Sequence, residues 1–350
     1  MRVKWLEEGH VQLLVQASEK ASRLGQKLQK LLQEEHGLES TYRSFTHLSK
    51  AKSSYYRYDL DCKPIKLGAL RFFQPRSEGV PKSFFLKWSG FELAHPVLER
   101  FLNSYAFRTF ATARFFGHFR HHERAVFVWE FVEGQQPVFA KTDMNEMALI
   151  VEAVAEINAV PEELASKLDG VRVKIPYLAP VAERVEALVR SSGLDQARQA
   201  TLLTMIELFS KSEGALLRRF EELGQHHLTH DDLVGRNILI RTSDNRMVLL
   251  DWENVYMSAA GTGLRVLARW EAASRDVLAA HYVACLARLG FHVPLRDVLF
   301  AIEGAHTLQT LHWGVTHTNL NRIESGLAFF HHFRKRLTAH APWLLFAGAA

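Results

Sequence analysis

The sequence predicts an α+β protein with a β-rich first part and a larger, mainly α-helical second part. Short runs of aromatic and β-branched residues, each bounded by polar residues, recur up to about residue 133, for example at 83–88 and 125–132. From residue 143 onward, apolar residues recur instead at helical spacing over long segments. A hydrophobic content of 47% with only 10 prolines indicates a chain that folds around a core along most of its length.

The first part opens with a segment at 3–36 whose leucines and alanines form one apolar stripe of an amphipathic helix. We expect this N-terminal extension, residues 1–40, to pack on the β-rich part or on a partner subunit, which would give a homodimer. A helix is also expected from Pro96, because proline favours the first helical turn, to about residue 116. Strands are expected at four places in the β-rich part, residues 41–133: 42–47, 55–60, 83–88 and 125–132.

The second part, residues 134–350, is expected to contain helices separated by glycine or proline. The first runs from 143 to 160 and ends at Pro161, and later breaks fall at Gly193 and Gly224. The remaining helices are expected at 180–193, 194–223, 264–289, 295–312 and 321–339.

Between these helices, two apolar runs of strand formers joined by a small polar turn predict a β-hairpin at 237–250. Asn237 stands at the start of the first strand and Asp251 follows the end of the second. Antiparallel pairing therefore brings both side chains to the same end of the hairpin. The loop at 230–236 places Asp232 beside them. Phosphoryl transfer needs such a set: a carboxylate for the attacking hydroxyl, and an Asn and an Asp to hold Mg²⁺ on the nucleotide phosphates.

The pattern H-x-D-x-x-x-x-N, followed by a hydrophobic residue and D-W-E, resembles the aminoglycoside phosphotransferase/choline kinase family, a small-molecule branch of the protein-kinase-like fold. Asp231 stands where the commonest family wording has Gly, and the rest of the pattern is present. The resemblance spans about 45–340. It implies a two-lobe fold with a small β-rich N-lobe and a larger helical C-lobe, to which the N-terminal helix is an addition.

The resemblance also implies a reaction: transfer of a phosphoryl group from ATP, or alternatively GTP, to a hydroxyl of a small molecule, with Mg²⁺ bound. Asp232 would be the base, and Asn237 and Asp251 the metal ligands. Among the neighbouring residues, we expect His230 to hydrogen-bond the backbone near this loop. Asp231 and Arg236 are expected to point to solvent.

A kinase of this type needs a cation on the phosphates and an acid that orients it. Lys87, near the end of the strand at 83–88, matches the family's phosphate-binding lysine in position and context. Its acid is Glu99 or Glu92, which would share a face if the helix extended back far enough. We prefer Glu99, because Pro96 argues for a later helix start.

Two further nucleotide contacts are implied by position alone. The strand at 125–132 resembles the family's hinge, whose backbone pairs with the adenine, and this assigns Glu130, Phe131 and Val132. The loop at 48–54 would cover the phosphates, with Ser49, Ser53 and Ser54 contributing hydroxyls. That loop departs from a Gly-x-Gly pattern, so the way in which it would hold the phosphates differs from the usual one.

The composition of the sequence argues against a disulfide-rich, a secreted or a membrane-spanning protein. Two cysteines, Cys62 and Cys285, are too few for a disulfide framework, and acids near the N-terminus argue against a signal peptide. No stretch approaches the 18 or so apolar residues of a membrane span. We therefore expect a cytoplasmic protein with no membrane partner. The net charge of +5 is compatible with a nucleic-acid-binding protein, but the sequence contains no arginine-rich arm, metal finger or aromatic-basic strand motif that would support this function.

The charge of the last segment bears on the acceptor. Residues 254–350 contain nine Arg and Lys, five acids and eight histidines. Such a balance argues against a polycationic acceptor and favours a neutral or anionic one, such as a sugar, a sugar phosphate or a nucleoside. The leading hypothesis is thus an ATP-dependent small-molecule phosphotransferase. The alternative is a catalytically silent, nucleotide-binding relative that serves as a regulatory or interaction module.

Overall fold

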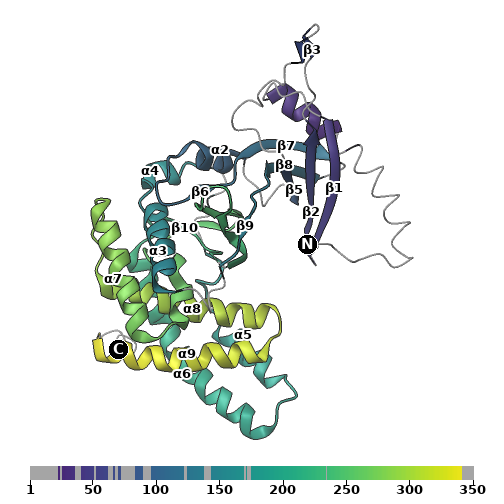
Figure 1. Ribbon diagram of the computed structural model, residues 1–350. Helices are drawn as coiled ribbons and strands as arrows, with labels where there is room; N and C mark the ends of the chain where they lie inside the picture. The colour runs from purple at the N-terminus through teal and green to yellow at the C-terminus, as the bar shows by residue number, and fades with distance from the viewer. Residues whose placement is uncertain are drawn as a thin grey trace. The chain divides into compact units, whose positions relative to one another are not determined.

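The computed structural model (Figure 1) is described at residues 23, 26–35, 41–50, 53–61, 66–67, 70–71, 83–89, 96–121, 124–137, 143–168, 171, 175–233 and 235–340. At 41–89, 121, 124 and 336–340 only the backbone is described. The described chain divides into two compact units. Unit 1 lies within Met1–Ala106, Thr112–Gln135 and Arg241–Val248, and unit 2 within Phe107–Ala111, Gln136–Ile240 and Leu249–Ala350.

Unit 1 contains a five-stranded antiparallel sheet with the order β1-β2-β5-β8-β7. All four strands predicted in this part of the chain are present. The strands of this sheet are β1 (Thr41–Lys50), β2 (Ser53–Asp61), β5 (Ser83–Ser89), β7 (Phe115–His121) and β8 (Arg124–Glu130). β7 was not predicted as a strand, and neither were four short strands: β3 (Lys66–Leu67), β4 (Leu70–Arg71), β6 (Ala111–Thr112) and β9 (Gly134–Gln135).

Helix α2 (Pro96–Ser104) begins where predicted but ends well before residue 116. The prediction of a longer helix was wrong because the polar residues of its last turn bind the backbone beyond it. The amide of Asn103 donates from Nδ2 to Ala113 O at 3.2 Å, and its Oδ1 accepts from Phe115 N at 2.5 Å. The aromatic residues that follow belong to β7, where a register shift between Phe115 and Gly117 bends the strand.

The described part of the N-terminal extension, residues 26–35, is a helix that packs within unit 1. Leu28, Leu31 and Leu32 are buried. Gly117 of β7 has φ +125, and a Cβ there would lie 2.9 Å from Glu35 Oε2 and 3.3 Å from Leu31 Cδ1. The positive φ therefore favours glycine at this position, and the missing side chain lets the helix lie close to the strand. Packing on the β-rich part was one of the two expected roles of this helix, and the homodimer stays a prediction.

Unit 2 is mainly helical, as predicted. Asp143 and Asp195 cap two of its helices, because their carboxylates accept from Glu146 N at 2.8 Å and Arg198 N at 2.9 Å. The helices are α3 (Met144–Asn158), α4 (Glu162–Ala165), α5 (Ala182–Arg190), α6 (Gln196–Leu223), the 3₁₀ helix η3 (Thr262–Arg269), α7 (Ala272–Arg288), α8 (Leu295–Thr316) and α9 (Leu320–His340).

The single helix predicted at 264–289 is wrong. The segment forms η3 and α7, which are separated at Trp270, whose backbone is extended. The break allows the two pieces to pack on different partners: η3 contacts α8, and α7 contacts α3. Helical periodicity continues across the break in the sequence, which is why the pattern alone did not reveal it.

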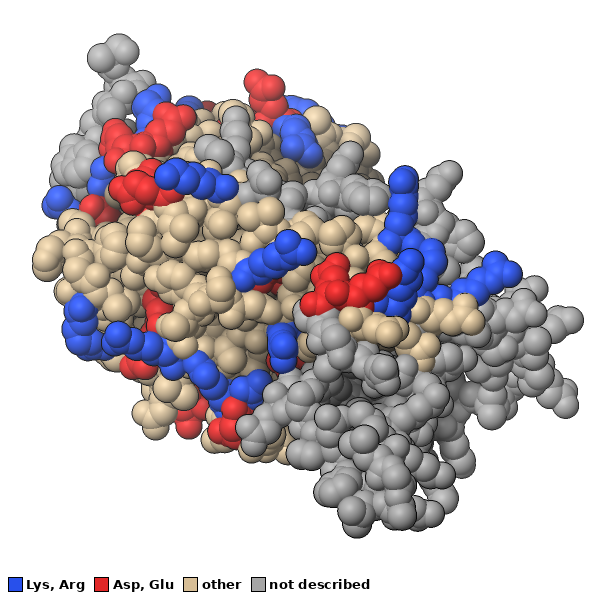
Figure 2. All heavy atoms as spheres, turned by 90° about the horizontal axis from the view of Figure 1, so that it is seen from above, with Lys and Arg blue, Asp and Glu red and all other residues tan. Residues whose placement is uncertain are grey.

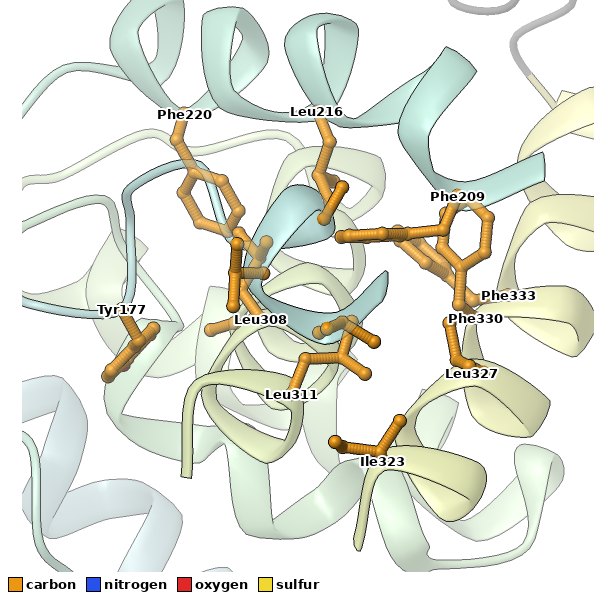
Figure 3. Close-up of a cluster of buried hydrophobic side chains, with 14 of the residues drawn as sticks. Tyr177, Phe209, Leu216, Phe220, Leu308, Leu311, Ile323, Leu327, Phe330 and Phe333 are labelled. Atoms are coloured by element: carbon orange, nitrogen blue, oxygen red, sulfur yellow. The ribbon is translucent and has the colours of Figure 1, made fainter. Parts of the chain in front are cut away.

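The main core of unit 2 lies among α5, α6, α8 and α9. Figure 3 shows its aromatic and aliphatic side chains pointing toward one another from these helices. Phe209 of α6 and Phe330 of α9 meet edge to face, with ring centroids 5.1 Å apart. A core of this size gives the neighbouring loops a rigid support.

Two antiparallel strand pairings lie around the candidate site. β10 (His227–His230) pairs antiparallel with β13 (Val255–Ser258), a pairing that was not predicted. β11 (Ile238–Arg241) and β12 (Met247–Leu249) are the strands of the predicted hairpin. A 3₁₀ turn, η2 (Gly235–Asn237), leads into β11.

On the face drawn in Figure 2, both blue lysine and arginine side chains and red aspartate and glutamate side chains lie among the described residues. Within the described residues, no helix is both long enough and apolar enough to cross a membrane.

Candidate active site

The candidate catalytic residues lie on the chain between β10 and β13 in unit 2. β10 ends at His230, whose backbone is paired with Val255 of β13. Leu250 N donates to Asn237 O at 2.8 Å, so the residue before Asp251 is bonded to the residue before β11. Asn237 and Asp251 therefore come to the same end of the hairpin, as antiparallel geometry requires.

Asp232 is held by two donors. Asn237 Nδ2 donates to Asp232 Oδ2 at 3.0 Å and to Asp232 O at 2.8 Å. Arg236 donates to the same carboxylate oxygen at 2.7 Å, although its own side chain is largely exposed. The expectation that Arg236 is solvated thus missed its contact with Asp232. These bonds fix the orientation of the carboxylate and of the Asn237 amide together.

His230 connects this loop to the end of β12. Its Nε2 lies 2.9 Å from Leu250 O, and its Nδ1 accepts from Asp232 N at 3.2 Å. A neutral ring with the proton on Nε2 satisfies both bonds. Burial lowers the pKa of His230, which keeps the ring neutral. The expected backbone-bonding role of His230 is confirmed.

Asp231 does not point to solvent, and that expectation was wrong. Its carboxylate is buried and accepts from Arg265 NH1 at 2.8 Å and from the Tyr177 hydroxyl at 2.6 Å. Arg265 also donates to Asp231 O, and its Nε donates to Gln309 Oε1 at 2.7 Å. Burial raises the pKa of the Asp231 carboxyl, and the guanidinium of Arg265 opposes that shift.

Arg265 and Tyr177 are the residues of the site that the sequence did not indicate. Arg265 comes from η3, and Tyr177 from the segment before α5. The side chain of Arg265 is buried, so Asp231 and Arg265 form an ion pair screened little by water. The only local sign of this ion pair in the sequence was Asp231, which stands where the family pattern commonly has Gly.

The backbone at Asp251 is in the left-handed region, with φ 62. Aspartate is among the few residues other than glycine that adopt this region with some frequency. Such backbone strain, on the order of 1–3 kcal/mol, is concentrated at functional sites. The next residue, Trp252, fixes the turn, because its Nε1 donates to Leu249 O at 3.1 Å and its ring stacks near Phe110.

The donor set at this end of the hairpin fits a divalent cation such as Mg²⁺. It consists of the Asp251 carboxylate and the Asn237 amide oxygen, which are the hard oxygen ligands that Mg²⁺ prefers. Because Asn237 Nδ2 is fixed on Asp232, Oδ1 faces the opposite side of the amide. No described residue donates a hydrogen bond to that oxygen.

Lys87 lies in β5 of unit 1, where its backbone is paired with Tyr55 of β2 and Phe127 of β8. Its side chain lies outside the described residues. Glu99 of α2 is buried and accepts from Trp129 Nε1 at 3.0 Å. Glu92, the alternative acid, also lies outside the described residues. The preference for Glu99 therefore stays a prediction.

The other predicted nucleotide contacts also lie in unit 1. Ser49, Ser53 and Ser54 belong to β1 and β2, with Ser49 paired to Ser54, so the strands extend into the segment predicted to be a loop. The loop prediction was too wide, because small polar residues also continue a hairpin up to its turn. Glu130 ends β8 and its carboxylate accepts from Arg114 N at 3.1 Å, and Phe131 and Val132 follow the strand.

Comparisons with known proteins establish the fold. No protein-family model matches the sequence, and no curated protein matches it. Solved structures do match. A choline kinase from Cryptosporidium parvum Iowa II has a TM-score of 0.57 at 11% identity, covering 86% of this chain and 93% of that one. An aminoglycoside phosphotransferase from Alicyclobacillus acidocaldarius has a TM-score of 0.52 at 16% identity, covering 84% and 92%.

A GDP complex of an aminoglycoside 2′-phosphotransferase is a third match, with a TM-score of 0.54 at 12% identity over 89% of this chain and 98% of that one. Similarity at such low identity shows the fold. The predicted α+β, protein-kinase-like fold is confirmed.

Proposed function

We propose that the protein is a nucleotide-dependent phosphotransferase that transfers the γ-phosphoryl group of ATP, or alternatively GTP, to a hydroxyl of a small molecule. The observation that carries this proposal is the cluster at the end of the β11–β12 hairpin. There, Asn237 and Arg236 orient the Asp232 carboxylate, and Asn237 and Asp251 offer two oxygen ligands. A fold shared with choline kinase and aminoglycoside phosphotransferases supports the same reaction class.

In this proposal each residue has one task. Asp232 accepts the proton of the acceptor hydroxyl or orients that hydroxyl for in-line attack on the γ-phosphorus. Asn237 and Asp251 hold Mg²⁺, which, when bound, neutralises charge on the nucleotide phosphates. His230 keeps the loop attached to the end of β12, so that Asp232 and Asp251 share one rigid support.

The nucleotide contacts proposed for unit 1 are those expected from the sequence. Lys87 would bind phosphate oxygens and Glu99 would orient it. The backbone of Glu130, Phe131 and Val132 would pair with the base. The serines beside the β1–β2 turn would approach the phosphates: Ser49, Ser53 and Ser54. One matching structure is a GDP complex, which supports a nucleotide as the phosphoryl donor.

We propose that the acceptor is neutral or anionic. Four of the five acids after residue 253 form ion pairs with arginines: Asp276, Asp297, Glu303 and Glu324. Acids neutralised in this way contribute little attraction for a polycation. Apart from these acids, the charged and titratable residues after residue 253 are mainly arginines and histidines. Sugars, sugar phosphates and nucleosides suit such a basic segment better than the polycationic aminoglycosides do.

A nucleotide-consumption assay tests the proposal. The purified protein would be incubated with ATP or GTP, Mg²⁺ and a panel of sugars, sugar phosphates, nucleosides, choline and aminoglycosides, with Asp232→Asn as the blank. We expect stimulation by at least one neutral or anionic hydroxyl compound that is absent in the blank. Stimulation by aminoglycosides alone would refute the acceptor class. Tight Mg²⁺-nucleotide binding with no acceptor response across the panel would favour the silent, regulatory alternative.

A further inference from the structure

A second cluster of chemically active side chains lies in unit 2, between α3 and α7. These helices pack on each other and are drawn side by side in Figure 1. Glu152 comes from α3, and His281 and Cys285 come from α7. The two α7 residues are four positions apart, which places them on the same face of the helix.

The cluster has the geometry of a metal site. His281 Nε2 lies 2.9 Å from Glu152 Oε1 and 3.7 Å from Cys285 Sγ, and the three ligand atoms lie within 4.8 Å of one another. Tetrahedral bonds of about 2.0–2.3 Å to one zinc ion place ligand atoms roughly 3.3–3.6 Å apart. Small side-chain adjustments therefore bring all three atoms to bonding distance of one ion.

The ligand set also fits in chemical type. One imidazole nitrogen, one sulfur and one carboxylate oxygen are the three ligand classes of zinc, and Mg²⁺ or Ca²⁺ would instead require oxygens alone. Cys285 is buried, whereas the side chains of Glu152 and His281 are about one-third exposed, at 31% and 32%. An ion can therefore enter from the exposed side, where water supplies the fourth ligand.

Arg288, one turn farther along α7, donates from NH2 to Cys285 Sγ at 3.1 Å. Burial raises the pKa of the Cys285 thiol, and the guanidinium of Arg288 opposes that shift. Outer hydrogen bonds of this kind tune the ligands of many metal sites.

From this cluster, we propose that Glu152, His281 and Cys285 bind a zinc-type transition-metal ion that clamps α3 to α7. Binding replaces the hydrogen bond between His281 and Glu152 by two metal–ligand bonds. His281 Nε2 gives up the proton of that hydrogen bond, so that the neutral ring carries its proton on Nδ1, and the thiol proton of Cys285 passes to solvent when the sulfur–metal bond forms. No electron is transferred. The site is separate from the Mg²⁺ ligands proposed for phosphoryl transfer.

Titration with Co²⁺ tests this site directly, since a Co²⁺–thiolate bond gives a charge-transfer band in the near ultraviolet. The whole protein, freed of metal with EDTA, should develop this band with one equivalent of Co²⁺, and added Zn²⁺ should displace it. Cys285→Ser should abolish the band. Cys62→Ser removes the only other cysteine of the chain and should leave it intact.

Two more variants separate a bound ion from an ordinary His–Glu ion pair. His281→Gln and Glu152→Gln should each weaken Zn²⁺ binding by at least about 10-fold, the smaller end of the effect seen even for outer-sphere partners. Bound Zn²⁺ should raise the Tm of the wild type and of Cys62→Ser but not of Cys285→Ser. Absence of the Co²⁺–thiolate band in the folded wild type, or its persistence in folded Cys285→Ser, would overturn the proposal.

Discussion

Replacing Arg265 by methionine should destabilise unit 2 strongly. Met preserves much of the aliphatic volume but removes the bonds to the carboxylate and carbonyl of Asp231 and to Gln309. Asp231 would then keep only the Tyr177 hydroxyl as a described partner for a buried charge. Breaking a buried ion pair by removing one partner costs about 3–5 kcal/mol. We expect a loss in that range, together with lower turnover, because Asp231 directly precedes Asp232.

The pH dependence of this loss gives the prediction a second test. Burial already raises the pKa of Asp231. Without the guanidinium that opposes this shift, the pKa should rise further. At acid pH both folded proteins hold Asp231 protonated, so the extra loss should be smallest there. It should grow as the pH rises from the folded-state pKa of the wild type to the higher one of the variant, and it should be complete above the latter. The measurement is urea unfolding of wild type and Arg265→Met, followed by circular dichroism, across the acid range.

A double-mutant cycle with Asp231→Asn isolates the pair. The combined variant Asp231→Asn/Arg265→Met should be more stable than the sum of the single losses implies, by about 1–3 kcal/mol. A loss below about 1 kcal/mol in Arg265→Met, or strictly additive losses in the cycle, would refute the reasoning. Either result would mean that water reaches Asp231 and screens its charge.

Three further predictions follow from single residues. Asp251→Ala should weaken nucleotide binding in the presence of Mg²⁺ but not in its absence, as measured by calorimetry, and a variant that binds Mg²⁺-ATP as tightly as the wild type contradicts the metal role. Gly117→Ala should destabilise unit 1 by about 1–3 kcal/mol, because φ +125 strains any residue with a Cβ; unchanged urea unfolding would show that the backbone at residue 117 adopts another conformation without cost. Burial, with Arg269 and Arg265 nearby, lowers the pKa of His306 to about 4. As the pH falls, His306 therefore binds a proton in the unfolded state before it does so in the folded state. The free energy of unfolding should decrease between about pH 6.5 and pH 4, by up to roughly 3 kcal/mol. His306→Gln should flatten that slope, and an equal slope in both proteins would rule out His306 as its source.

The sequence predicted the parts of the site whose signals are local. Strand formers on either side of a polar turn predicted the β11–β12 hairpin, and hairpin geometry then placed Asn237 and Asp251 at one end of it. The helices of unit 2 were predicted because their apolar spacing reflects the face that each one buries. Both the hairpin and the helices depend on residues that are close together in the sequence.

What the sequence could not predict depends on contacts between distant segments. Asp231 and Arg265 are 34 residues apart, and an aspartate in a polar loop gives no sign that a buried arginine will neutralise it. The start of β7 was read as helix because its phenylalanines also fit a helical stripe. Their assignment was decided by pairing with β8, which local periodicity does not encode.

We expect Asp232 to act on the acceptor and not on the nucleotide. The most direct measurement compares turnover and Mg²⁺-nucleotide affinity in Asp232→Asn, using the best acceptor of the panel and calorimetry on the same preparation. Asp244→Asn, an exposed acid in the turn of the same hairpin, is the matched control. We expect Asp232→Asn to lose about 10²–10⁴-fold in turnover with nearly unchanged nucleotide affinity, and the control to keep both. Undiminished turnover in Asp232→Asn, or a loss that merely follows weaker nucleotide binding, would contradict the account.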